Sequence, residues 1–266
     1  MSMFAISNSP WHTCPRRCKA FIAAALLLAG SATAPAQTHI PATTNPVAYA
    51  ENILVSARAR MEREPTNAEA MWQFGHACFD RAEFATKDTE RATLAVEGIA
   101  AMRRLTAREP KLAAGHYYLA MNLGQLARTK LLAALKLVDE MEHEFKSARA
   151  LDEHFDSAGP DRNLGQLYFQ APGWPASIGS RSKAHKHLER AVELAPGFPE
   201  NRLNLMEAYC EWKDRRGIQR EMKAITALWP AARTNFTGTA WAASWADWEK
   251  RRGELQVKAA KLLNAP

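Results

Sequence analysis

The fold is decided by a pattern of small and large residues in one stretch of the chain. It starts with Leu164-Gly165-Gln-Leu-Tyr168 and continues with Ala184, Leu188, Ala191 and Pro196. Small residues are needed where two helices approach closely, and large residues fill the space between neighbouring helix pairs. Proline cannot continue a helix, so Pro196 marks the end of the second one. The stretch therefore predicts two antiparallel helices that pack face to face.

The same arrangement recurs along the chain. Prolines 65, 110, 196 and 230 each end a predicted helix and precede another, and the last two are 34 residues apart. That spacing is the length of a tetratricopeptide repeat. We therefore predict an all-α fold, a tetratricopeptide-like helical-repeat solenoid over residues 46–266. An amphipathic four-helix bundle has similar periodicity but does not require the recurring prolines.

Several helices can be assigned before and after the deciding stretch. The pattern predicts a leading helix over Pro46–Arg63 and a closing helix over residues 240–263. Between them it predicts two pairs of helices, the first over residues 68–79 and Arg91–Arg108 and the second over residues 113–126 and 129–151. The closing helix carries Trp241, Trp245 and Trp248 on one face. We interpret this stripe as a C-terminal cap on the last repeat, since terminal repeats need one; a binding face is the alternative.

The aliphatic composition supports a helical fold. The chain of 266 residues contains 50 Ala and 25 Leu, but only 6 Val and 8 Ile. Ala and Leu favour helices, whereas β-branched residues favour strands. An all-β sandwich and a doubly wound parallel sheet are therefore excluded.

The N-terminus has the layout of a secretory signal peptide. Arg16, Arg17 and Lys19 precede a short apolar run over residues 20–29, and small residues follow up to Ala36. The run is shorter than the about 20 apolar residues that span a bilayer. We predict a signal peptide over 1–36, cleavage near Ala36, a linker over 37–45 and a periplasmic or secreted protein. An uncleaved N-terminal anchor is the alternative.

Cleavage would change both the charge and the cysteine content. The net charge of +7 falls to +4, because residues 1–36 hold three of the 35 basic residues and none of the 28 acidic ones. The remaining excess forms no basic block, which argues against nucleic acid as a partner. Cys78 and Cys210 remain, and their apolar helical surroundings predict buried free thiols rather than a disulfide.

A family resemblance rests on the segment Gly159-Pro160-Asp-Arg162-Asn-Leu164-Gly165-Gln-Leu-Tyr168, the Pro/Gly loop after it and the Ala-rich helix that follows. Over about residues 67–229 the chain resembles the T-component family of TRAP transporters. Eukaryotic regulators of microtubule dynamics look similar here, but a signal peptide does not fit them. The resemblance implies a periplasmic helical protein with cryptic tetratricopeptide-like repeats that associates with a periplasmic solute-binding protein. Some members of the family form trimers with apolar channels, which suggests hydrophobic ligands. The chain lacks the family's lipobox Cys.

The repeat register predicts a concave groove. Positions 2, 5, 9 and 12 of first helices line the groove in tetratricopeptide solenoids, which places there Trp72, His76, Phe79, Tyr117, Met121, Arg162, Gln166 and Phe169. Such a groove suits an extended peptide or an apolar carboxylate, whose charge Arg162 would hold bidentately. The alternative is core packing by the aromatic residues and a structural ion pair for Arg162.

The loop Gln170–Ser180 is the second candidate site. It holds Trp174 between Pro172 and Pro175, and loops on rigid scaffolds often carry function. We predict that Trp174 contacts a partner; the alternative is an indole that plugs the loop onto the helices.

Catalysis has little support in the sequence. The chain has no His-Glu-x-x-His, no Gly-x-Ser-x-Gly, no phosphate-binding glycine loop and no Cys/His metal spacing. We therefore predict no enzyme, no cofactor and no metal. The expected function is that of an exported scaffold that binds a protein partner. An apolar small molecule as a second ligand and assembly into a homo-oligomer are both left open. A generic envelope repeat protein without a small ligand is the alternative.

Overall fold

The computed structural model describes residues 45–130 and 134–264, which form ten α-helices and one 3-10 helix. These are α1 (Pro46–Arg63), α2 (Ala68–Glu83), α3 (Asp88–Arg108), α4 (Ala113–Ala127), α5 (Ala134–Leu151), α6 (Phe155–Gln170), α7 (Arg181–Leu194), α8 (Pro199–Glu211), α9 (Arg215–Asn235), η1 (Thr239–Trp241) and α10 (Ala242–Asn264). The predicted signal peptide and residues 37–44 of the predicted linker lie outside the described part.

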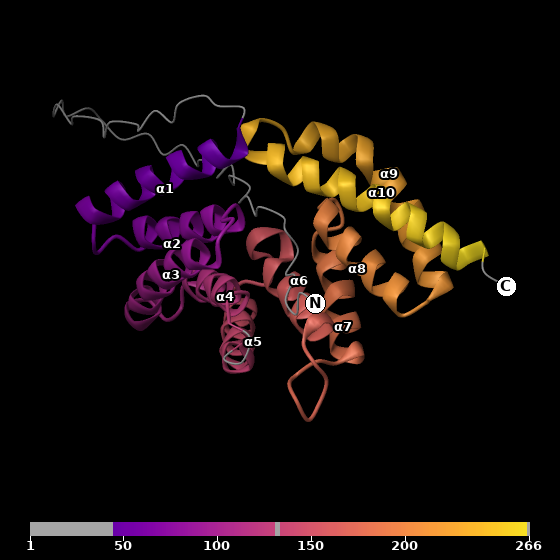
Figure 1. Ribbon diagram of the computed structural model, residues 1–266, viewed down its shortest axis with the longest axis horizontal. Helices are drawn as coiled ribbons and strands as arrows, with labels where there is room; N and C mark the ends of the chain where they lie inside the picture. The colour runs from indigo at the N-terminus through magenta and orange to yellow at the C-terminus, as the bar shows by residue number, and fades with distance from the viewer. Residues whose placement is uncertain (1–44, 131–133, 265–266) are drawn as a thin grey trace, which may run out of the picture.

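The helices stack into an arch (Figure 1). Four hairpins, α2/α3, α4/α5, α6/α7 and α8/α9, follow one another, and their first helices also contact each other in the order α2, α4, α6 and α8. Helix α1 packs on α2 at one end, and α10 packs mainly on α8 at the other. Helix α1 also contacts η1, so the two ends of the arch meet.

Helix boundaries follow from local sequence signals. Asn45 and Asn67 cap α1 and α2, and each side-chain oxygen accepts a 2.9 Å hydrogen bond from the backbone two residues on. Helices α1, α3 and α7 each end two residues before a proline, as predicted. The prediction for Pro230 is wrong, because this proline lies inside α9. The Pro230 side chain is exposed, whereas the nearby Trp229 and Ala232 are buried and pack α9 against the core, so the helix continues past the proline.

The deciding stretch forms the α6/α7 hairpin, and Gly165 sits at its closest approach. A Cβ at this position would lie 2.7 Å from Leu188 Cγ and 3.0 Å from its backbone nitrogen. Ala184, Leu188 and Ala191 on the facing side of α7 are fully buried. The small and large residues therefore have the packing roles that the sequence predicts.

The tryptophan stripe caps the last repeat, which confirms that interpretation. Trp241, Trp245 and Trp248 are all buried. Trp248 packs edge-on against Phe198, with ring centroids 5.6 Å apart, and its Nε1 donates a 2.7 Å hydrogen bond to Glu200 on α8. The aromatic cluster thus attaches α10 to the preceding hairpins.

The two described cysteines are buried free thiols, as predicted. Burial raises the pKa of Cys78 to about 12 and also raises the pKa of Cys210. Both thiols therefore stay protonated at neutral pH, which lowers their reactivity as nucleophiles.

Candidate functional site

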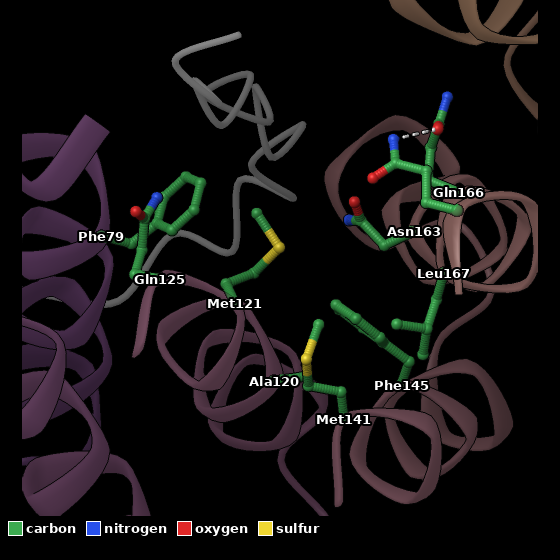
Figure 2. Close-up of a pocket in the computed structure, with 10 residues that line it drawn as sticks. Phe79, Ala120, Met121, Gln125, Met141, Phe145, Asn163, Gln166 and Leu167 are labelled. Atoms are coloured by element: carbon green, nitrogen blue, oxygen red, sulfur yellow. Dashed lines mark hydrogen bonds between the residues drawn. The ribbon is translucent and has the colours of Figure 1, made fainter. Parts of the chain in front are cut away.

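A pocket lies where α2, α4, α5 and α6 meet, and Figure 2 shows its walls. Its cavity volume is about 10 Å³, because the side chains around it fill most of the space. Its lining consists of Phe79, Ala120, Met121, Gln125, Met141, Phe145, Asn163, Gln166, Leu167 and Gln170. Aromatic, thioether and aliphatic side chains form most of this surface. Methionine adapts to irregular apolar shapes, which suits a pocket for variable apolar groups.

The polar groups in this pocket are four side-chain amides, and no charged residue lines it. Gln166 accepts a 2.9 Å hydrogen bond from Gln170, while its buried Nε2 has no hydrogen-bond partner among the described residues. An amide group of this kind can satisfy a carbonyl or hydroxyl without requiring a charge. The lining therefore fits a neutral, mostly apolar group better than an anion.

The structure brings three of the predicted groove residues, Phe79, Met121 and Gln166, together in this pocket. Two others, Trp72 and His76, lie side by side on α2. Both rings stack on Tyr118, with centroid distances of 5.8 and 4.5 Å, and His76 pairs with Asp80 at 3.1 Å. They are partly exposed and form an aromatic surface outside the pocket lining.

Tyr117 and Arg162, which are also predicted groove residues, lie in a buried polar cluster with Asp156. The Arg162 Nη2 atom is 2.8 Å from Asp156 Oδ2, and the Tyr117 hydroxyl donates a 2.6 Å hydrogen bond to the same carboxylate. Burial raises the pKa of Tyr117 well above its usual range. Both Tyr117 and Arg162 are fully buried. This geometry corresponds to the alternative interpretation, a structural ion pair for Arg162.

The cluster also stabilises an unusual turn at the start of α6. Asp156, Ser157 and Ala158 have φ values of 49°, 55° and 64°, a left-handed conformation that is costly for residues other than glycine. Arg162 Nη1 donates to the carbonyl oxygens of Asp156 and Ser157 at 3.1 and 2.9 Å. Asn201 on α8 donates to the Ser157 carbonyl at 3.1 Å. The Arg162 guanidinium therefore stabilises both the buried Asp156 carboxylate and the strained backbone of residues 156–158.

The remaining two predicted residues lie near the loop between α6 and α7. Phe169 packs edge-on against Trp212, with ring centroids 5.8 Å apart, outside the pocket of Figure 2. Trp174 is 89% exposed on a loop that projects from the helices (Figure 1), so the indole does not plug the loop onto them. A hydrogen bond of 2.9 Å from Gly179 N to the Pro172 carbonyl closes the loop.

Sequence reasoning missed part of the pocket. Met141 and Phe145 on α5 line it, but the repeat register assigns groove residues to first helices only. The register also gave no sign of a second pocket between α7 and the turn that follows α8, which includes Arg181, His185 and Trp212. Both sets depend on how neighbouring hairpins pack, which periodicity within one helix does not determine.

Two kinds of site are not found in the described part of the chain. No helix among residues 45–130 and 134–264 is long and apolar enough to cross a membrane. The same residues contain no group of three or more His, Cys, Asp or Glu side chains placed to hold a metal ion.

Comparison with solved structures supports the helical-repeat fold. No protein-family model matches the chain, and no curated protein matches it. Among solved structures, a thermophilic tetratricopeptide-repeat protein of Thermus thermophilus is similar, with a TM-score of 0.53, 17% identity, and coverage of 82% of this chain and 92% of the other. Likeness at this identity establishes the fold: the chain is an all-α, tetratricopeptide-like helical-repeat solenoid.

Proposed function

We propose that this protein is an exported helical-repeat scaffold that binds an apolar group in the pocket of Figure 2. The pocket itself carries the proposal, because it combines Phe, Met and Leu walls with amide groups and no charge. Ligand pockets are typically apolar with a few placed polar groups. The occupant is an apolar side chain of a protein partner or an apolar small molecule, and the flexible Met121 and Met141 side chains move to admit it.

The proposed partner is a periplasmic solute-binding protein, as the resemblance to TRAP T-components implies. The exposed Trp174 supports a protein contact outside the pocket, since tryptophan is enriched at the energetic centres of interfaces. A generic envelope scaffold without a small ligand is the second candidate. The near-complete burial of Phe79, Met121 and Gln166 favours it, because side chains already fill much of the groove.

Filling the pocket is expected to weaken binding of an apolar probe. In the variant Met121→Trp the larger indole occupies the pocket, so the affinity for the fluorescent probe N-phenyl-1-naphthylamine should fall at least about tenfold, a loss of about 1.4 kcal/mol. Val96→Trp is the matched control, because Val96 is 52% exposed on α3 and lies outside the pocket. Equal probe affinity in the wild type and Met121→Trp, with both folded by circular dichroism, would contradict the proposal.

Export is expected to leave a chain that begins at Gln37. We expect N-terminal sequencing of the periplasmic fraction to show this residue first, because small residues precede it in the layout that signal peptidases cut. Replacing two leucines of the apolar run by Arg should keep the full chain in the cytoplasm. Recovery of the wild type in the cytoplasm, starting at its own first residues, would count against export.

A further inference from the structure

A second pocket opens at the edge of the arch, between α7 and the turn from α8 to α9. Its volume is about 380 Å³, and its lining is Arg181, Ser182, His185, Tyr209, Trp212 and Asp214. It shares no residue with the pocket of Figure 2. An inference about this second pocket therefore does not depend on what the first one binds.

The second pocket combines aromatic rings with one guanidinium group. The Arg181 guanidinium lies 5.1 Å from the Trp212 ring centroid. Arg220 lies outside the lining: its guanidinium is 5.2 Å from the Tyr209 ring centroid and pairs with Glu189 and Glu221. A guanidinium stacked on a ring keeps its N–H edges free for a planar carboxylate. Arg181 forms no ion pair with any residue in the described ranges, in contrast to Arg162 in the core.

The charges around this pocket favour an anionic occupant. Lys213, in the turn beside Trp212, is exposed and forms no ion pair within the described part of the chain. Of the nearby acids, Glu189 pairs with Arg220 at 3.1 Å. Asp214 lines the pocket and accepts a 3.0 Å hydrogen bond from the Gly217 amide, but it forms no ion pair within the described residues. The two cations Arg181 and Lys213 outnumber this one carboxylate, so the rim keeps a net positive charge.

An acidic polypeptide fits this surface better than a nucleic acid. The pocket is compact, whereas proteins that follow a phosphate backbone carry a stripe of basic residues along it. Carboxylates pair bidentately with arginine, and an aromatic or aliphatic neighbour gains by packing on an indole. Trp174, on the loop that leads into α7, is 89% exposed on the same hairpin but is not part of this lining.

We propose that this second pocket binds an acidic segment of a partner protein. One Asp or Glu carboxylate pairs with Arg181, and an adjacent apolar or aromatic side chain packs against Trp212. Fluorescence anisotropy with a labelled peptide Gly-Glu-Asp-Phe-Glu-Asp-Gly tests this. The full-length protein should bind it saturably at low ionic strength, and Arg181→Ala should bind it at least about tenfold more weakly, since one charge-assisted contact is lost.

Three controls make the test specific. Arg104→Ala removes the same charge from an exposed position on α3 and should bind like the wild type. A peptide with Gln and Asn in place of Glu and Asp should not bind. Met121→Trp should keep full peptide affinity, so failure at the first pocket and failure at the second are distinguishable.

Other results would overturn the proposal. Absence of saturable peptide binding would do so, as would an equal loss in Arg104→Ala, which would reduce the effect to general charge attraction. Tighter, Arg181-dependent binding of a single-stranded oligothymidylate than of the peptide would assign the surface to nucleic acid instead.

Discussion

Replacement of Glu200 by alanine is expected to lower the free energy of unfolding by about 3–5 kcal/mol, the usual cost of breaking a buried ion pair on one side. Glu200 is fully buried at the start of α8. Its carboxylate accepts 2.7 Å hydrogen bonds from Trp248 Nε1 and Arg251 Nη1 on the capping helix α10. Without it, a guanidinium and an indole N–H lose this partner in the region that attaches α10 to the solenoid.

Urea denaturation followed by circular dichroism and tryptophan fluorescence measures this loss. Glu254→Ala is the matched control, because Glu254 is exposed on α10 and should change stability by less than about 0.5 kcal/mol. The double variant Glu200→Gln with Arg251→Met should be less destabilised than Glu200→Ala, since it removes the buried guanidinium together with its shortest ion-pair partner; in Glu200→Ala the guanidinium stays buried with only Glu207 and Asp247 as ion-pair partners. A loss below about 1 kcal/mol in Glu200→Ala would show that the cap is held by aromatic packing rather than by this carboxylate.

Replacement of Arg162 by alanine is expected to have an effect of similar size, about 3–5 kcal/mol at pH 7. The variant leaves the Asp156 carboxylate buried without its guanidinium, and it removes two hydrogen bonds that hold the left-handed turn of residues 156–158. Arg162→Lys should recover little, because an ammonium group cannot reproduce the planar fork of donors. Chemical denaturation of the three proteins under identical conditions measures both differences.

The pH dependence of the stability of Arg162→Ala tests whether the unpaired Asp156 carboxylate causes the loss. Burial raises the pKa of Asp156, whereas Arg162 opposes that shift. Without the arginine the pKa rises further, so the folded variant takes up a proton at a higher pH than the unfolded chain. The stability deficit should therefore be largest at neutral pH and shrink as the pH falls through the raised folded-state pKa. Arg103→Ala is the control: its pair with Glu140 is largely exposed and should contribute at most about 1 kcal/mol.

The comparison of sequence and structure shows which features depend on local chemistry. Helix ends at Arg63, Arg108 and Leu194 were predictable, because a proline two residues on restricts the backbone by itself. Pro230 misled the prediction, because burial of Trp229 and Ala232 outweighs one missing hydrogen bond. At Pro230, tertiary packing therefore outweighs the local tendency of proline to end a helix.

The candidate sites were less predictable than the fold. The register predicted Phe79, Met121 and Gln166 on one surface, and these three side chains line the same pocket, since periodicity determines the face of a helix. It also placed Arg162 in the groove, because periodicity does not reveal that the turn before α6 folds Asp156 back onto the guanidinium. The pocket at Trp212 and Arg181 lies between two hairpins. The sequence motif within each hairpin does not determine how the two pack together, so this pocket could not be predicted.

The contact between α1 and η1 has a consequence for how the protein can evolve and unfold. An open solenoid can gain or lose a repeat at little cost, because each unit touches only its neighbours. Here the first helix touches the segment just before the last, so adding one hairpin would pull these ends apart. Contacts between segments so distant in sequence also form late in folding, after a large loss of chain entropy. The closed arch should therefore unfold as one cooperative unit rather than fray from its ends.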